Sequence, residues 1–150
     1  MEDYIEDRHI GVYGLIIKEE KILLIKKKSG PYDGKLDLPG GGIKFREKID
    51  DALKRELKEE TNLDIKEYKL FDVDSVNPDW LWDNKECKTH HIGIFYIIDS
   101  YDNEIKNSID IDDENDDSLG AEFYDISSLT KDKLSLITIL ELEKLGYNLK

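Results

Sequence analysis

Three glutamates crowd the end of one predicted helix and carry the clearest chemistry in the sequence. Glu56, Glu59 and Glu60 follow a Pro-Gly-Gly-Gly turn at residues 39–42. Carboxylates three and four residues apart share one face of a helix, and the helical spacing of apolar residues places Glu56 and Glu60 on the core side. Partly buried like charges are unfavourable unless something neutralises them. The pattern therefore predicts a hard divalent cation held by oxygen ligands, with Mg²⁺ as the first choice.

The alternative interpretation is a solvated acidic helix end in which each Glu pairs with a nearby Lys or Arg. For Glu59 alone that interpretation is adequate. It is weaker for Glu56 and Glu60, because Ile49, Leu53 and Leu57 form the apolar stripe beside which both acids fall. A glycine turn next to the acids also allows backbone groups to approach a ligand closely.

The same stretch resembles the Nudix box in residue types and in spacing. The matching positions are Gly41, Glu47, Arg55, Glu56, Leu57, Glu59, Glu60 and Leu63. A motif with so many fixed positions is more specific than a lone glycine-rich loop. Three positions depart from the usual pattern: Asn62 replaces a Gly, Lys44 an acid and Arg46 a Gly. Asn is the next-best residue for a left-handed helix end, whereas Lys44 and Arg46 add positive charge beside the expected phosphate site.

The resemblance implies both a fold and a set of site residues. The fold would be α/β, a Nudix-type α/β/α sandwich with a mixed β-sheet. Glu56, Glu59 and Glu60 would hold Mg²⁺ or Mn²⁺ together with the backbone carbonyl of Gly40. The catalytic residues would include Glu59, Glu47 and Arg55. Arg55 would pair with Glu47 in the bidentate geometry that suits a guanidinium and a carboxylate. Glu122 is the candidate for a further acid from outside the box, and a surface acid on an edge strand is the equal alternative.

Signals for the rest of a substrate are thinner. Lys44 and Arg46 are assigned to substrate binding by their charge, and Trp80 and Trp82 by the ability of aromatic faces to stack on a base. Further aromatic candidates are Tyr32, Phe95 and Tyr96. His90 and His91 point to opposite faces of a strand, so one of them could reach the pocket. A hydrogen-bonded structural histidine is the preferred alternative.

The order of elements agrees with a mixed sheet covered by helices. Strands are predicted at residues 10–17, 21–25, 36–38, 64–73, 89–98 and 121–126, and helices at 48–61 and 131–145. Residues 75–88 and 99–118 are predicted as loops, the second one acidic and solvated. No linker or repeat divides the chain, so residues 1–150 are expected to form a single domain.

Composition excludes several classes of function. The net charge of −13 argues against binding to long nucleic acid. No apolar run is long enough to span a membrane, and the acidic N-terminal stretch does not resemble a signal peptide. The single cysteine, Cys87, cannot form an internal disulfide and fits a reducing cytoplasm. Apolar residues lie around the whole last helix, so a second copy of the chain could cover it as a homodimer.

The expected function is therefore a Mg²⁺-dependent Nudix hydrolase. It would cleave the pyrophosphate bond of a nucleoside diphosphate linked to another moiety, using a water activated by the metal. A non-catalytic Nudix-fold sensor of a nucleotide metabolite is the alternative, and Lys44 and Arg46 are its support. A third hypothesis is that the acidic stretch at residues 110–117 docks a protein partner.

Overall fold

The computed structural model describes residues 3–105 and 118–150. Its elements, in chain order, are β1 (Ile5–Leu15), β2 (Ile17–Lys18), β3 (Lys21–Lys27), a 3₁₀ turn η1 (Gly30–Tyr32), β4 (Leu36–Asp37), β5 (Gly40–Gly42), α1 (Ile49–Thr61), β6 (Asp64–Val76), β7 (Asp79–Trp82), β8 (Lys85–Asp102), β9 (Ser118–Asp125), the 3₁₀ turns η3 (Ile126–Ser128) and η4 (Lys131–Lys133), and α2 (Leu136–Lys144). The acidic stretch at residues 110–117, for which partner docking was predicted, lies outside the described residues.

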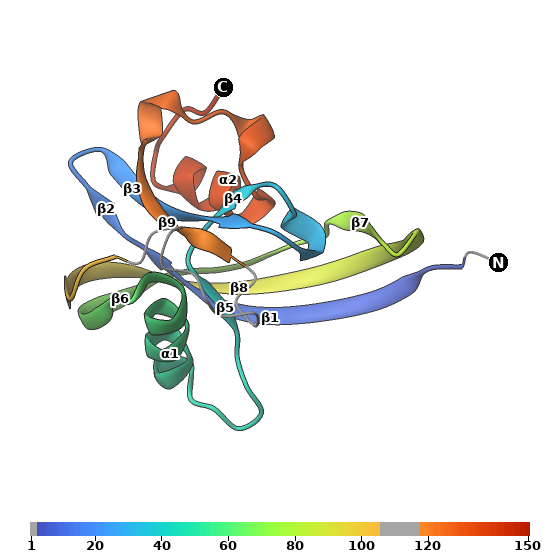
Figure 1. Cartoon of the computed structure of the whole chain (residues 1–150), viewed down its shortest axis with the longest axis horizontal. Helices are drawn as coiled ribbons and strands as arrows, with labels where there is room; N and C mark the ends of the chain where they lie inside the picture. The colour runs from blue at the N-terminus through green and yellow to red at the C-terminus, as the bar shows by residue number, and fades with distance from the viewer. Residues whose placement is uncertain (1–2, 106–117) are drawn as a thin grey trace.

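Strands form two sheets between the helices. One sheet has the order β5-β1-β8-β6, with β7 also paired to β8, and its β1–β8 pair is parallel while its other pairs are antiparallel. The other sheet has the order β2-β3-β4, with β9 paired to β3. In Figure 1 helix α1 lies on one side of the strands and α2 on the other. The α/β class with a mixed sheet is thus confirmed.

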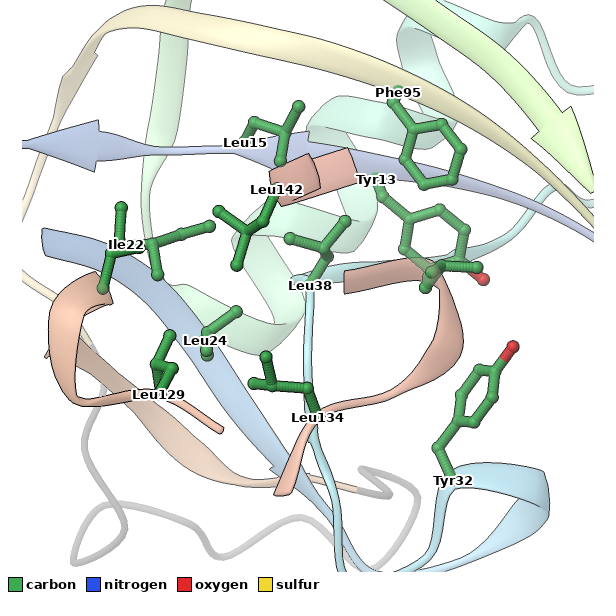
Figure 2. Close-up of a cluster of buried hydrophobic side chains, with 12 residues drawn as sticks. Tyr13, Leu15, Ile22, Leu24, Tyr32, Leu38, Phe95, Leu129, Leu134 and Leu142 are labelled. Carbon is green, nitrogen blue, oxygen red and sulfur yellow. The ribbon is translucent and has the colours of Figure 1, made fainter. Parts of the chain in front are cut away.

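Alternation along the strands explains the two cores. Val12 packs with Leu53 and Leu57 of α1, whereas its neighbour Tyr13 packs in the cluster that α2 covers. Strand β3 divides in the same way, so that each of its faces is buried under a different helix. Figure 2 shows the α2 cluster, in which leucines from β1, β3 and the C-terminal segment lie to one side of Phe95 and Tyr13. Each fully buried Leu of this kind stabilises the fold by about 1.5–3 kcal/mol.

Two sequence predictions about α1 are confirmed and one is wrong. The helix spans residues 49–61, and Asn62 closes it in the left-handed conformation at φ 69°. Leu53 and Leu57 are buried as expected. Ile49, however, is 40% exposed, because it is the first residue of the helix and lies at the end away from the core.

The segments predicted as loops are shorter than expected. Residues 79–82 form β7, which pairs with the start of β8 through a two-residue turn at Asp83 and Asn84, both with positive φ. Such a turn matches the twist of a hairpin, so a Trp-Leu-Trp strand forms where the sequence analysis expected a loop. Strand β8 likewise continues to Asp102, beyond the expected end at residue 98.

The last helix is shorter than predicted. It begins at Leu136 rather than at residue 131, because Ser135 caps it by accepting a hydrogen bond from the Thr138 N–H. The preceding residues form the 3₁₀ turn η4. No helix in the described parts of the chain combines the length and the apolar character needed to cross a membrane.

Candidate active site

The glycine turn and the acids of α1 are brought into direct contact. Strand β5 pairs with β1, which sets Gly40 opposite Tyr13 and Gly41 opposite Val12. Gly40 has φ 142°, and a Cβ there would lie 2.1 Å from the Val12 carbonyl oxygen. A Cβ on Gly41 would lie 2.6 Å from Oε2 of Glu56. Position 40 therefore requires glycine, and the missing side chain at Gly41 leaves the space that the Glu56 carboxylate occupies beside the strand backbone.

The three glutamates differ in environment as the helical period predicts. Glu60 is buried, with 5% exposure, and its Oε1 accepts a 3.3 Å hydrogen bond from the Gly40 N–H. Glu56 is largely covered, and burial raises the pKa of its carboxyl although Arg55 opposes that rise. The Glu59 side chain is 56% exposed. Two carboxylates thus lie toward the core and the third at the margin.

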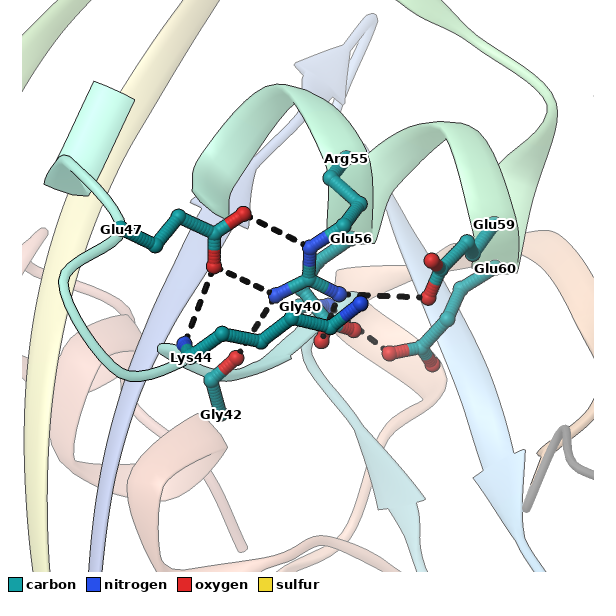
Figure 3. Close-up of polar contacts among 8 residues, drawn as sticks. All are labelled: Gly40, Gly42, Lys44, Glu47, Arg55, Glu56, Glu59 and Glu60. Carbon is teal, nitrogen blue, oxygen red and sulfur yellow. Dashed lines mark hydrogen bonds and ion pairs between the residues drawn. The ribbon is translucent and has the colours of Figure 1, made fainter. Parts of the chain in front are cut away.

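Arg55 organises the acids and the loop before the helix (Figure 3). Its Nε and Nη2 donate to the two carboxylate oxygens of Glu47, each at 2.8 Å, and Nη1 donates to Glu56 at 2.8 Å and to Glu59 at 3.4 Å. Nη2 also donates to the Gly42 carbonyl at 2.9 Å. These bonds to Arg55, and one from the Lys44 N–H, lower the pKa of Glu47 to about 2. Glu47 is therefore an anion that holds the guanidinium in place.

Glu56, Glu59 and Glu60 line one cavity of about 580 Å³, together with the glycines of β5. All of these groups offer oxygen atoms, the donors that Mg²⁺ and Mn²⁺ accept. Within the described residues, no three His, Cys, Asp or Glu side chains are gathered closely enough to hold a metal ion as they lie. In Figure 3 the Arg55 guanidinium lies against Glu56 and Glu59 and supplies positive charge beside them.

The other side of the cavity is built around His91. Its Nε2 lies 2.6 Å from the Tyr13 hydroxyl and its Nδ1 lies 2.7 Å from the Tyr32 hydroxyl. These residues come from β8, β1 and η1 respectively, and all of them line the cavity. Lys27, at the end of β3, also lines it, and its charge adds to the burial that lowers the pKa of His91 and opposes the burial that raises the pKa of Glu56. The cavity thus has an acidic side, a phenol–imidazole side and a cation near both.

Four of the residues predicted for the substrate or for catalysis lie elsewhere. Lys44 and Arg46 are exposed on the loop between β5 and α1 and are not among the residues that line the cavity, so their role in substrate binding stays a prediction. Trp82 is 60% exposed on the β7–β8 hairpin. Trp80 is indirectly connected, because its Nε1 donates to Thr89 Oγ1 at 2.8 Å, and Thr89 is a lining residue.

Glu122 is not brought to the acids of α1. Its neighbours Ala121 and Phe123 pack in the α1 cluster, whereas Tyr124 packs in the α2 cluster. Because side chains alternate along a strand, Glu122 shares the face of Tyr124, and it is exposed there. This position agrees with the alternative of a surface acid, and a catalytic role for Glu122 stays a prediction.

Sequence reasoning missed the parts of the cavity that depend on long-range pairing. Tyr13 was predicted only as a strand residue and Asp37 only as part of an extended segment, and Lys27 was assigned to no element. His91 was one of two histidines considered, and the structure makes it both hydrogen-bonded and a lining residue. The alternation of residues 89–95 was the available signal, because it places Thr89, His91 and Phe95 on one buried face.

The chain belongs to the NUDIX domain family, whose model matches residues 7–140. It is 38% identical over 122 residues to an ADP-ribose pyrophosphatase of Methanocaldococcus jannaschii, a match that covers 81% of this chain and 64% of that one. The chain spans between about half and two thirds of the length of the curated relatives it matches.

Solved structures support the same fold. A MutT NUDIX hydrolase from Burkholderia pseudomallei superposes with a TM-score of 0.73 at 24% identity, covering 93% of this chain and 99% of that one. A bifunctional NMN adenylyltransferase/ADP ribose pyrophosphatase from Francisella tularensis, solved with AMP and a manganese ion, gives a TM-score of 0.51 at 25% identity. That match covers 93% of this chain and 42% of the larger protein.

Proposed function

We propose that this chain is a divalent-cation-dependent hydrolase that cleaves the pyrophosphate bond of a nucleoside diphosphate linked to another group, with ADP-ribose as its foremost substrate. The observation that carries the proposal is the convergence on one cavity of the acids of α1 and the glycine turn, with the buried Glu60 bonded to the Gly40 N–H. The 38% identity to an ADP-ribose pyrophosphatase supports the choice of substrate.

Roles follow from the positions of the side chains. Glu56, Glu59 and Glu60, with the Gly40 carbonyl, would hold Mg²⁺ or Mn²⁺ after Glu56 and Glu59 exchange Arg55 for the ion. When bound, such an ion neutralises phosphate oxygens and lowers the pKa of a water molecule. Arg55 remains anchored by its bidentate bond to Glu47 and keeps the loop before α1 against the helix. Lys27 lies where it can attract the second phosphate of the substrate.

We favour cleavage over the sensor alternative. It depended on positive charge from Lys44 and Arg46 at the site, and neither residue lines the cavity. No other observation favours binding without cleavage.

The direct test is hydrolysis of a panel containing ADP-ribose, ADP-glucose and ATP, with Mg²⁺ or Mn²⁺ and with chelator. We expect metal-dependent release of AMP from ADP-ribose. Glu59→Gln should lower kcat by roughly a hundredfold or more, since electrostatic groups at such sites are typically worth that much. Glu59 is exposed, so its replacement should leave folding intact.

Glu143→Gln is the matched control, because Glu143 is an exposed helix glutamate on α2, outside the cavity. Reaction in ¹⁸O-labelled water shows whether the label enters AMP or ribose 5-phosphate and so which phosphorus is attacked. The proposal is refuted if ADP-ribose stays intact with either metal, or if Glu59→Gln and Glu60→Gln both retain native activity.

A further inference from the structure

Two tyrosines share one histidine inside the cavity. The Tyr13 hydroxyl bonds to Nε2 of His91 and the Tyr32 hydroxyl bonds to Nδ1. Figure 2 shows both phenol rings, with their hydroxyl ends directed toward the same side of the buried cluster. His91 is buried, with 2% exposure, and among the described residues it is the only hydrogen-bond partner of either hydroxyl.

At least one of the two phenol hydrogens cannot form a hydrogen bond with His91. A neutral imidazole has one N–H donor and one acceptor nitrogen, so it can accept the proton of only one of the two phenols. The other phenol must accept the imidazole N–H, and its own O–H is then available to a different partner. A charged imidazole would donate to both oxygens and leave two phenol hydrogens, so at least one remains in either state.

Burial favours the neutral imidazole. Burial, with His9 and Lys27 as further causes, lowers the pKa of His91 to about 3. Burial also raises the pKa of both phenols above the ordinary value, so both retain their protons near neutral pH. The arrangement is therefore an uncharged chain of hydrogen bonds that ends in a phenol donor, and the tautomer of His91 determines whether that phenol is Tyr13 or Tyr32.

We propose that the Tyr13–His91–Tyr32 relay, the chain of hydrogen bonds joining these three side chains, donates a hydrogen bond from its free phenol O–H to an uncharged acceptor on the ligand. That acceptor lies on the part of the ligand beyond the diphosphate, so the relay determines which nucleoside diphosphate derivatives bind. This inference rests on the proposed function for the nature of the ligand. Asp7 and Asp37 line the same cavity, and Lys27 is the one lysine or arginine among the described residues that line it, so acids outnumber cations there and an uncharged acceptor is favoured over a further anionic group. The acceptor belongs either to the base or to the sugar.

The test measures binding rather than cleavage. The probe is α,β-methylene ADP-ribose, in which the bridging oxygen is replaced, titrated calorimetrically in the presence of Mg²⁺. The variants are Tyr13→Phe and Tyr32→Phe, each of which removes a single oxygen atom. Tyr68→Phe is the matched control, because the Tyr68 hydroxyl donates to Asp50 at 3.0 Å and does not line the cavity.

We expect one of the two cavity variants to bind the probe about tenfold more weakly, the usual worth of one hydrogen bond. Tyr68→Phe should bind it like the native protein. Deaza-adenine analogues remove acceptors from the base, and deoxyribose analogues remove them from the sugar. With the analogue that lacks the true acceptor, the difference between the native protein and the sensitive variant should disappear, which identifies the source.

Two results would overturn the relay's role. One is that both cavity variants bind the probe within about twofold of native, and the other is that native protein does not bind the probe at all. The proposed function fails separately: binding that depends on a cavity tyrosine, without cleavage of ADP-ribose, would refute the hydrolase and leave the relay in place. Cleavage of ADP-ribose together with binding that depends on neither cavity tyrosine would refute the relay and leave the hydrolase in place.

Discussion

The stability of this protein should fall as the pH rises from weakly acidic to weakly alkaline, because of one carboxyl in α2. Glu141 is fully buried, and its carboxyl lies beside that of Asp72. Asp72 of β6 is a charged neighbour, and Asp72 and Asp74 both accept hydrogen bonds from Lys144 Nζ, at 2.6 and 2.5 Å. Burial, followed by the proximity of Asp72, raises the pKa of Glu141 to about 8.

The sign and size follow from proton linkage. In the unfolded chain the carboxyl ionises near its ordinary value of 4.5, whereas in the folded chain it keeps its proton to about pH 8. Between these values the folded state binds a proton that the unfolded state has released, so raising the pH favours unfolding. At about 1.4 kcal/mol for each factor of ten, the free energy of unfolding should drop by about 4 kcal/mol between pH 5 and pH 8.5.

Glu141→Gln removes the titration and keeps the shape. The variant should match native protein near pH 5 and exceed its free energy of unfolding by several kcal/mol at pH 8.5, as measured by urea denaturation across that range. The pKa values of Asp72 and Asp74 are lowered, mainly through bonds to Lys144, so their contributions change only at more acidic pH. Glu143→Gln, an exposed acid on the same helix, is the control. If the curves for Glu141→Gln and native protein run parallel from pH 5 to 8.5, the reasoning is refuted.

Three further substitutions test the positions that shape the site. Gly40→Ala should lower the free energy of unfolding by about 3 kcal/mol or more, as measured by chemical denaturation. Gly34→Ala should lower it by less, because both glycines have positive φ but only Gly40 lacks room for a Cβ. Ser135→Ala removes a helix cap and should lower the free energy of unfolding by about 1–2 kcal/mol, which calorimetry would detect as a lower thermal midpoint. Arg55→Lys should reduce kcat/KM for ADP-ribose roughly ten- to a hundredfold in steady-state assays, because an ammonium cannot bridge Glu47 in bidentate fashion.

The helix and its acids could be read from the sequence because their arrangement is local. A period of 3.6 residues fixes which of Glu56, Glu59 and Glu60 lies toward the core, and the structure orders their exposure accordingly. The pairing of Arg55 with Glu47 also follows from short range, since both lie within one loop and the helix it enters. The left-handed Asn62 depends only on the backbone at the helix end.

The far side of the cavity could not be read in this way, because it depends on register between distant strands. Positive charge was expected from Lys44 and Arg46, which are near the acids in sequence, whereas Lys27 provides it from another strand. Glu122 was assigned by its place before the last helix, and a strand's alternation turned it to the opposite face. Sequence distance and spatial distance disagree most where sheets bring segments together.

One pair of glycines connects these two sides. Gly11 of β1 and Gly93 of β8 are partners in the parallel ladder. A Cβ on Gly11 would lie 2.3 Å from the Tyr13 hydroxyl oxygen, and one on Gly93 would lie 2.3 Å from the Phe95 ring. The two rings stack at 5.7 Å, so both lie along the sheet over the space that the glycines leave. That space allows the Tyr13 hydroxyl to reach His91, while the Tyr13 backbone pairs with Gly40 beside the acids. The register of β1 therefore sets the acidic side and the phenol–imidazole side at once.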